Sequence, residues 1–318
     1  MAEILRPMST GELMDRTFGL YKKNFWLFVG IASLGPATYL LFQLLTIGSA
    51  SLQAGNPDRV SPISAASLGI GFVAGFLVML AGMAIAHAAT VRAVASVHLG
   101  LPIRIVDAYK SLKGNIWRVL GVFFVMLLLA GLAAFCATLI SVAIVLMVRF
   151  MLMGSGPVAA RREAEIVSAF LGFSAVIAVL VCAMIVWVRY ALAVACCVVE
   201  HLGVIKSIRR SSTLSKGSRF RIFLIYLVFV LLSVVVGAML GGVAGGVGIV
   251  IPYIPARLIL VYLASFIAGS LTSPLATIGI ALAYYDERVR KEAFDLQFMM
   301  SSLDSPAPLP GPAISVQP

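Results

Sequence analysis

Long apolar stretches alternate with short charged segments along most of the chain. Six long intervals contain no Asp, Glu, Lys or Arg, and each holds the roughly 20 apolar residues that an α-helix needs to cross a hydrocarbon layer about 30 Å thick. Pro252 and Pro255 mark the end of the fifth interval, which is too short for two crossings and a turn. The pattern therefore predicts six single crossings, near residues 25–47, 68–90, 119–147, 167–188, 222–251 and 258–283.

The composition supports the same class of fold. Of the 318 residues, 61% are hydrophobic and 12% are charged, whereas soluble domains carry about 25% charged residues. The mean hydropathy is +1.05, and a water-soluble core of this length could not bury so much apolar surface. We therefore expect an all-α polytopic membrane helix bundle, and the composition excludes an ordinary soluble enzyme.

The basic residues are divided unevenly between the two ends of the predicted spans. Most of the 24 Lys and Arg residues lie in the N-terminal segment, the second and fourth loops and the tail. Only five lie on the opposite side: Arg59, Arg149, Arg161, Arg162 and Arg257. By the positive-inside rule, both termini of this multi-pass membrane protein are expected in the cytoplasm.

The net charge of +11 is then best explained by topology and by attraction to anionic lipid headgroups. No motif of a nucleic-acid-binding module accompanies the basic residues, so nucleic acid is not expected as a partner. Residues 1–300 are expected to form one integral membrane domain, without a cleaved signal peptide. Residues 301–318, rich in proline, are expected to form a disordered cytoplasmic tail.

A short motif precedes the first, third and fifth spans. A stretch of mixed polar and apolar residues leads into Lys, then Asn or Ser, then an aromatic residue. The matching residues are Lys23, Asn24 and Trp26, then Lys113, Asn115 and Trp117, then Lys216, Ser218 and Phe220. The motif favours three parallel repeats, each an interfacial helix followed by a helical hairpin, although cytoplasmic entries alone could also select these residue types.

The first such segment has the pattern of an in-plane amphipathic helix. Leu13 and Phe18 are expected to face the acyl chains, while Arg16 and Lys23 face the headgroups. The aromatic residue that follows is expected to anchor the span at the interface. The segment from Tyr284 is expected to form a second amphipathic helix on the cytoplasmic side.

The fourth loop is the segment richest in candidate chemistry. Glu200 and His201 follow an apolar stretch and could form a proton relay or an ion site, whereas the alternative is that Glu200 pairs with Lys206, Arg209 or Arg210. His87 and His98 are lesser candidates. The residues expected to face headgroups or a cytoplasmic partner are Glu200, Lys206, Arg209, Arg210, Lys216, Arg219, Arg288 and Arg290.

Neither a metal nor a cofactor is expected. The four cysteines lie in apolar sequence, with no acid or histidine at a metal-ligand spacing, and they are interpreted as small hydrophobic residues. The fifth span is rich in glycine at four-residue spacing, which favours close helix packing, with a flexible segment or a thin wall beside a permeation path as the alternative. These glycines are Gly237, Gly241, Gly242, Gly245, Gly246 and Gly248.

Three segments resemble a known family. They are RPMSTGELMDRTFGLYKKNFWLF from Arg6, VVEHLGVIKSIRRSSTLSKGSRFR from Val198 and YYDERVRKEAFDL from Tyr284. Together they resemble the bacterial glycerophosphoryl diester phosphodiesterase membrane domain family. The resemblance implies a six-span membrane protein whose motif positions are Glu200, Arg210, Ser211, Lys216, Gly217, Tyr285, Asp286, Arg288, Arg290, Glu292 and Asp295.

The phosphodiesterase activity in the family name is not expected here. In some members the membrane domain is fused to a soluble catalytic domain, which would need a barrel of roughly 250 residues with metal-binding carboxylates and paired histidines. With three histidines and thirteen acidic residues scattered at membrane edges, this chain is not expected to be an enzyme. The leading hypothesis is a noncatalytic scaffold or lipid-interacting module, possible partners being anionic lipids and a further membrane or cytoplasmic protein. The alternative is a transporter or lipid-handling permease.

Overall fold

The computed structural model describes residues 7–54, 62–98, 100–153 and 158–292. The tail predicted to be disordered, 301–318, lies outside the described residues. The described chain contains eleven helices and no strand. They are α1 (Thr10–Lys23), α2 (Phe25–Ala32), α3 (Leu34–Ala54), α4 (Pro62–His98), α5 (Ile105–Lys110), α6 (Ile116–Met153), α7 (Val158–Tyr190), α8 (Ala193–Val199), α9 (Val204–Leu214), α10 (Arg219–Gly248) and α11 (Ile254–Glu292).

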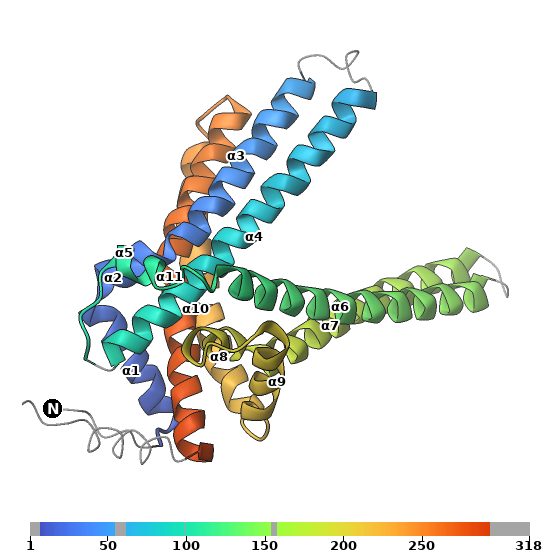
Figure 1. Ribbon diagram of the computed structural model, residues 1–318. Helices are drawn as coiled ribbons and strands as arrows, with labels where there is room; N and C mark the ends of the chain where they lie inside the picture. Colours follow the sequence, from blue (N-terminus) through green and yellow to red (C-terminus); the bar gives the residue numbers. More distant parts are fainter. Residues whose placement is uncertain (1–6, 55–61, 99, 154–157, 293–318) are drawn as a thin grey trace, which may run out of the picture.

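Six helical segments are long and apolar enough to cross a membrane, which confirms the predicted all-α polytopic fold class. They are Phe25–Ser49, Gly69–His98, Ile116–Met151, Ile166–Val199, Arg219–Gly248 and Ile254–Glu292. The segments form three hairpins, α3–α4, α6–α7 and α10–α11 (Figure 1). The α6–α7 hairpin extends away from the other two, and α6 and α7 pack mainly against each other.

The short helices and the ends of the long helices form a common base for the three hairpins (Figure 1). The buried segments there are Ala93–Ala95 of α4, Leu192–Val198 in the turn after α7 and in α8, and Ile280–Tyr285 of α11. Small side chains dominate the first two of these segments, so the backbones can approach closely. The base is therefore the protein's main core, while the distal parts of the hairpins expose apolar side chains that suit a lipid environment.

The three copies of the motif are equivalent in the structure. Residues at the same intervals along the chain are at most 1% exposed in all three copies: Thr17, Ala108 and Ser211; Phe28, Val119 and Ile222; Ile31, Val122 and Ile225. The backbone supports the same match, because Gly114 and Gly217 both have a positive φ, 97° and 91°, just before Asn115 and Ser218. Each copy therefore enters its hairpin with the same buried face.

Helix α1 differs from the expectation for an in-plane helix. Ser9 and Glu12 form a capping box that starts the helix, and α1 then packs along the end of α11. Leu13 is fully buried in the core, and the ring of Phe18 lies 5.7 Å from that of Phe229. The prediction that Leu13 faces acyl chains is wrong, because protein from α10 and α11 covers the apolar face of α1.

The glycines of the fifth span also differ from their expected role. A Cβ added at Gly237, Gly241, Gly242, Gly245 or Gly246 would meet no atom within 4 Å, so these residues make no close packing in the described chain. The close approach of α10 and α11 occurs at Gly279, where a Cβ would lie 2.6 Å from Phe229. Of the glycines expected to pack, Gly248 does so, against the side chain of Arg257.

Candidate functional site

A cluster of ion pairs joins the N-terminal segment to the ends of α10 and α11. The Asp286 carboxylate is fully buried and accepts a hydrogen bond from the Met8 backbone N–H at 2.6 Å. It also pairs with Arg221, and with Arg290 at 2.8 Å. Both arginines donate in turn to the Met8 carbonyl, at 2.7 and 2.6 Å. One carboxylate thereby fixes three segments that are far apart in the sequence.

Glu287 extends this cluster by one residue and is equally buried. It accepts a hydrogen bond from the Ser218 hydroxyl at 2.5 Å and pairs with Lys291 at 3.0 Å. Lys291 also donates to the Leu214 and Lys216 carbonyls, which end α9 and form the following turn. The turn that contains the third copy of the motif is thus held against α11.

A second cluster surrounds Glu200 and joins the fourth loop to the end of α11. The Glu200 carboxylate lies 3.1 Å from Nε of Arg210 and accepts a hydrogen bond from the Tyr284 hydroxyl at 2.7 Å. Arg210 also pairs with Glu292, and Glu292 pairs with Arg288 at 3.1 Å. Of the three bases considered for Glu200 in the sequence, the structure pairs it with Arg210.

The pKa of Arg210 reflects this environment. Burial alone would lower the pKa of the guanidinium, but the charge of Glu200 and the hydrogen bonds to Glu200 and Glu292 outweigh it and raise the pKa. Arg210 is therefore a permanent cation in the cluster. The contacts of Glu200 with Arg210 and Tyr284 are those of a structural clamp between the fourth loop and the end of α11.

The eight residues selected from the sequence fall into two sets. Glu200, Arg210, Arg288 and Arg290 are engaged in ion pairs within the protein. The side chains of Lys206, Arg209, Lys216 and Arg219 are exposed on α9, the following turn and the start of α10, with no carboxylate within 4 Å among the described residues. We refer to these four exposed cations as the basic face.

An exposed lysine and an exposed aromatic residue recur together at the start of each hairpin. The aromatic residues Trp26, Trp117 and Phe220 are 80%, 84% and 72% exposed. The lysine four residues earlier in each copy is also exposed: Lys22, Lys113 and Lys216. An exposed aromatic ring and an exposed lysine near the end of an apolar span are typical of helices that are anchored at a membrane interface.

A cavity of about 530 Å³ lies where the three hairpins meet. It is lined by matching positions from all three copies, and we call it the axial cavity. Four complete sets of three contribute to its wall: Ala32, Phe123 and Tyr226; Met83, Trp187 and Ser273; His87, Ala191 and Thr277; Thr90, Val194 and Ile280. The wall is mostly apolar, and no Asp, Glu, Lys or Arg contributes to it.

Three polar side chains lie close together in the wall of the axial cavity. Nδ1 of His87 lies 3.0 Å from the Thr277 hydroxyl, which also donates to the Ser273 carbonyl at 3.2 Å. The Ser273 hydroxyl is buried and has no hydrogen-bond partner within the part of the chain that the structure describes. The sequence indicates His87 only as a lesser candidate. Its contact with Thr277 joins α4 to α11, and the two residues lie 190 positions apart in the chain.

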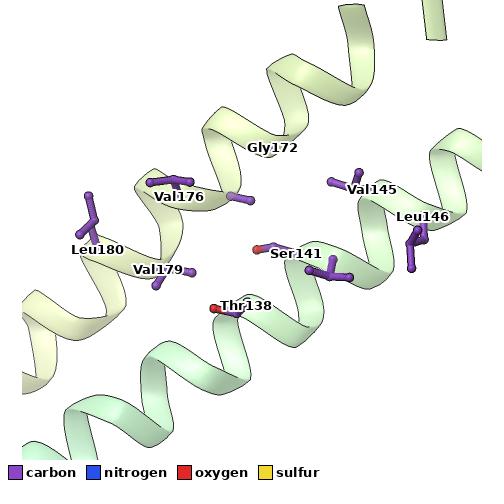
Figure 2. A pocket seen from close by; sticks show the side chains of 10 residues that line it. Thr138, Ser141, Val145, Leu146, Gly172, Val176, Val179 and Leu180 are labelled. Atoms are coloured by element: carbon purple, nitrogen blue, oxygen red, sulfur yellow. The ribbon is translucent and has the colours of Figure 1, made fainter. Parts of the chain in front are cut away.

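A second hollow, of about 420 Å³, lies between α6 and α7 (Figure 2). Its wall is formed by side chains such as Val145, Val176 and Leu180, with the hydroxyls of Thr138 and Ser141 turned toward the gap. The Thr138 hydroxyl already donates to the Ala134 carbonyl of its own helix. This hollow lacks the convergent polar groups of the axial cavity.

One sequence signal of this architecture was missed. The tripeptide His-Leu-Gly occurs at 98–100 and again at 201–203, and in both places Lys-Gly follows at the same distance, at Lys113 and Lys216. In the structure His201 contacts Asn115, with Nδ1 3.0 Å from the side-chain nitrogen, so the two ends of the second hairpin meet at the repeated residues. The signal could have identified the repeat boundaries.

The described residues contain no group of three or more His, Cys, Asp or Glu side chains that could hold a metal ion. Within the core, Cys196 and Cys197 are buried as free thiols. Comparisons of the chain with protein-family models, with curated proteins and with solved structures found no match.

Proposed function

We propose that this protein is a noncatalytic, lipid-interacting scaffold of the bacterial inner membrane, with both termini in the cytoplasm. The observation that carries the proposal is the exposed lysine and aromatic pair, which recurs at equivalent positions of the three copies. Three such pairs give the protein three anchors in the interfacial region of one leaflet.

The charge distribution supports an anionic lipid surface as the partner. The basic face has no acidic partner among the described residues. Four nearby carboxylates are instead paired with bases inside the protein: Asp286, Glu287, Glu200 and Glu292. The electrostatic potential at the surface of the basic face is therefore positive. Each basic residue near an anionic membrane surface contributes about 1 kcal/mol of attraction, so the basic face together with Lys22 and Lys113 favours anionic headgroups.

The proposal is tested by lipid selectivity in reconstituted protein. Spin-labelled phosphatidylglycerol and phosphatidylcholine are compared by electron paramagnetic resonance in phosphatidylcholine vesicles that contain the protein. The wild type is expected to enrich phosphatidylglycerol in its first lipid shell, more strongly at low salt. Replacing the basic face by glutamine, with K206Q, R209Q, K216Q and R219Q combined, is expected to remove much of this preference.

Arg257→Gln is the matched control, because it removes a cation at the opposite end of the spans. It is expected to leave the selectivity of the basic-face leaflet unchanged. Equal selectivity in the wild type and the fourfold variant would contradict the proposed lipid interaction. Active flux of a solute across the vesicles would instead favour the transporter alternative, for which the axial cavity is the supporting observation.

A further inference from the structure

The axial cavity has the size and the chemistry of a ligand site. Its volume of about 530 Å³ is within the range of roughly 300–1,000 Å³ that is typical of small-molecule sites. Such sites combine an apolar wall with a few convergent polar groups, and the wall here has that composition. All lining residues come from the six membrane-crossing segments. The cavity therefore lies within the membrane-crossing part of the chain.

The exposure of the wall indicates how a ligand enters. Tyr39 on α3 and Met83 on α4 line the cavity, and 37% and 39% of their surfaces are exposed. Because both residues lie in membrane-crossing segments, this exposed surface faces lipid. An opening at these residues would lead to the acyl-chain region, so the hydrophobic part of a membrane amphiphile could enter without crossing water.

The polar residues of the cavity limit which headgroup a bound ligand can carry. Nε2 of His87 makes no hydrogen bond within the described chain, and neither does the buried Ser273 hydroxyl. Thr277 lies between them on α11, one turn from Ser273. The Ser273 hydroxyl can donate to a carbonyl oxygen or exchange hydrogen bonds with a hydroxyl, and Nε2 of His87 donates or accepts according to its tautomer. Since no cationic Lys or Arg lines the cavity, a phosphate would have no counter-ion there.

We propose that the axial cavity binds one neutral lipid of the diacylglycerol class, with one of its two acyl chains against the apolar wall and its hydroxyl or an ester carbonyl at His87, Thr277 and Ser273. This site is separate from the basic face, which suits anionic headgroups at the membrane surface. The buried Ser273 hydroxyl without a partner is the second observation beside the cavity itself, because such groups normally have one.

The test uses full-length protein in phosphatidylcholine nanodiscs with a photoreactive diacylglycerol as the probe. In the wild type, labelling is expected to saturate, to map to peptides of α4 and α11, and to be displaced by dioleoylglycerol. Ser233→Phe places a ring in the cavity and is expected to lower labelling at least tenfold. Val234→Phe, on the adjacent exposed face of α10, is the matched control and is expected to label like the wild type.

Thr277→Val is the second test variant. It keeps the side-chain volume, so it tests the site even if Ser233→Phe fails to fold. Removing one hydrogen bond of about 0.5–1.5 kcal/mol is expected to weaken competition by dioleoylglycerol about 2- to 10-fold. Unchanged labelling in both Ser233→Phe and Thr277→Val would overturn the site. Displacement by dioleoylphosphatidylglycerol as effectively as by dioleoylglycerol would overturn the neutral headgroup. The fourfold basic-face variant is expected to bind the probe normally, so the two proposals can fail separately.

Discussion

Replacing Asp286 with Asn tests how strongly the buried carboxylate joins the N-terminal segment to α10 and α11. Asn keeps an oxygen that can accept the Met8 N–H but loses the charge opposite Arg221 and Arg290. Removing one partner of a buried ion pair typically costs about 3–5 kcal/mol, because the other charge is left uncompensated. The Arg221 side chain is only 18% exposed and would be stranded with only the more distant carboxylate of Glu287, at 3.7 Å.

Two features of the site reduce this cost. Arg290 is 39% exposed and can turn toward water, and Arg221 keeps its hydrogen bond to the Met8 carbonyl. We therefore expect Asp286→Asn to lower the free energy of unfolding by about 2–4 kcal/mol. The measurement is equilibrium unfolding by sodium dodecyl sulfate in mixed micelles. Asp107→Asn, the same change at an exposed position of α5, is expected to stay within about 0.5 kcal/mol of the wild type.

A double-mutant cycle isolates the interaction itself. Arg221→Met removes the stranded charge, so the loss in the combined variant with Asp286→Asn should be smaller than the sum of the two single losses by about 1–3 kcal/mol. Additive losses within about 0.5 kcal/mol would refute the assignment of the energy to this pair. A single loss below about 1 kcal/mol for Asp286→Asn would refute the argument from burial.

Two further predictions follow from packing and topology. Gly279→Ala is expected to destabilise the protein by about 1–3 kcal/mol in the same titration, because the added methyl would lie 2.6 Å from the ring of Phe229. The control Gly241→Ala meets no atom within 4 Å and should be neutral or slightly stabilising. Equal losses of stability in the two variants would contradict this prediction. In a Cys136→Ala background, Thr213→Cys is expected to react with a membrane-impermeable maleimide only from the cytoplasmic side and Tyr253→Cys only from the opposite side, and the reverse pattern would invert the topology.

The sequence was sufficient for the features that depend on local composition. Charge-free apolar stretches identify the spans because a membrane excludes unpaired charges over a fixed thickness. The entry motif identifies Trp26 and Trp117 as exposed residues because lysine and aromatic side chains have distinct positions at an interface. Both predictions depend only on residues that are close together in the sequence and on the properties of the membrane.

The features that depend on distant contacts were not accessible in this way. An apolar face such as that of α1 looks the same whether lipid or protein covers it, and only the position of α11 decides that Leu13 is buried. The glycine spacing of α10 permits close packing but does not name a partner. Likewise, nothing near Asp286 in the sequence points to Met8, which lies 278 residues away.

The matching positions around the axial cavity have a consequence for how the protein can diverge. In a ring of three identical subunits, a substitution on the axis appears three times, so one histidine always faces two more. A single chain with three copies is free of this constraint. The set of His87, Ala191 and Thr277 is an example, because the three copies contribute an imidazole, a methyl group and a hydroxyl to the same cavity. Joining the copies in one polypeptide thus allows a polar site on one copy of a repeated frame, and each copy can change by mutation without altering the others.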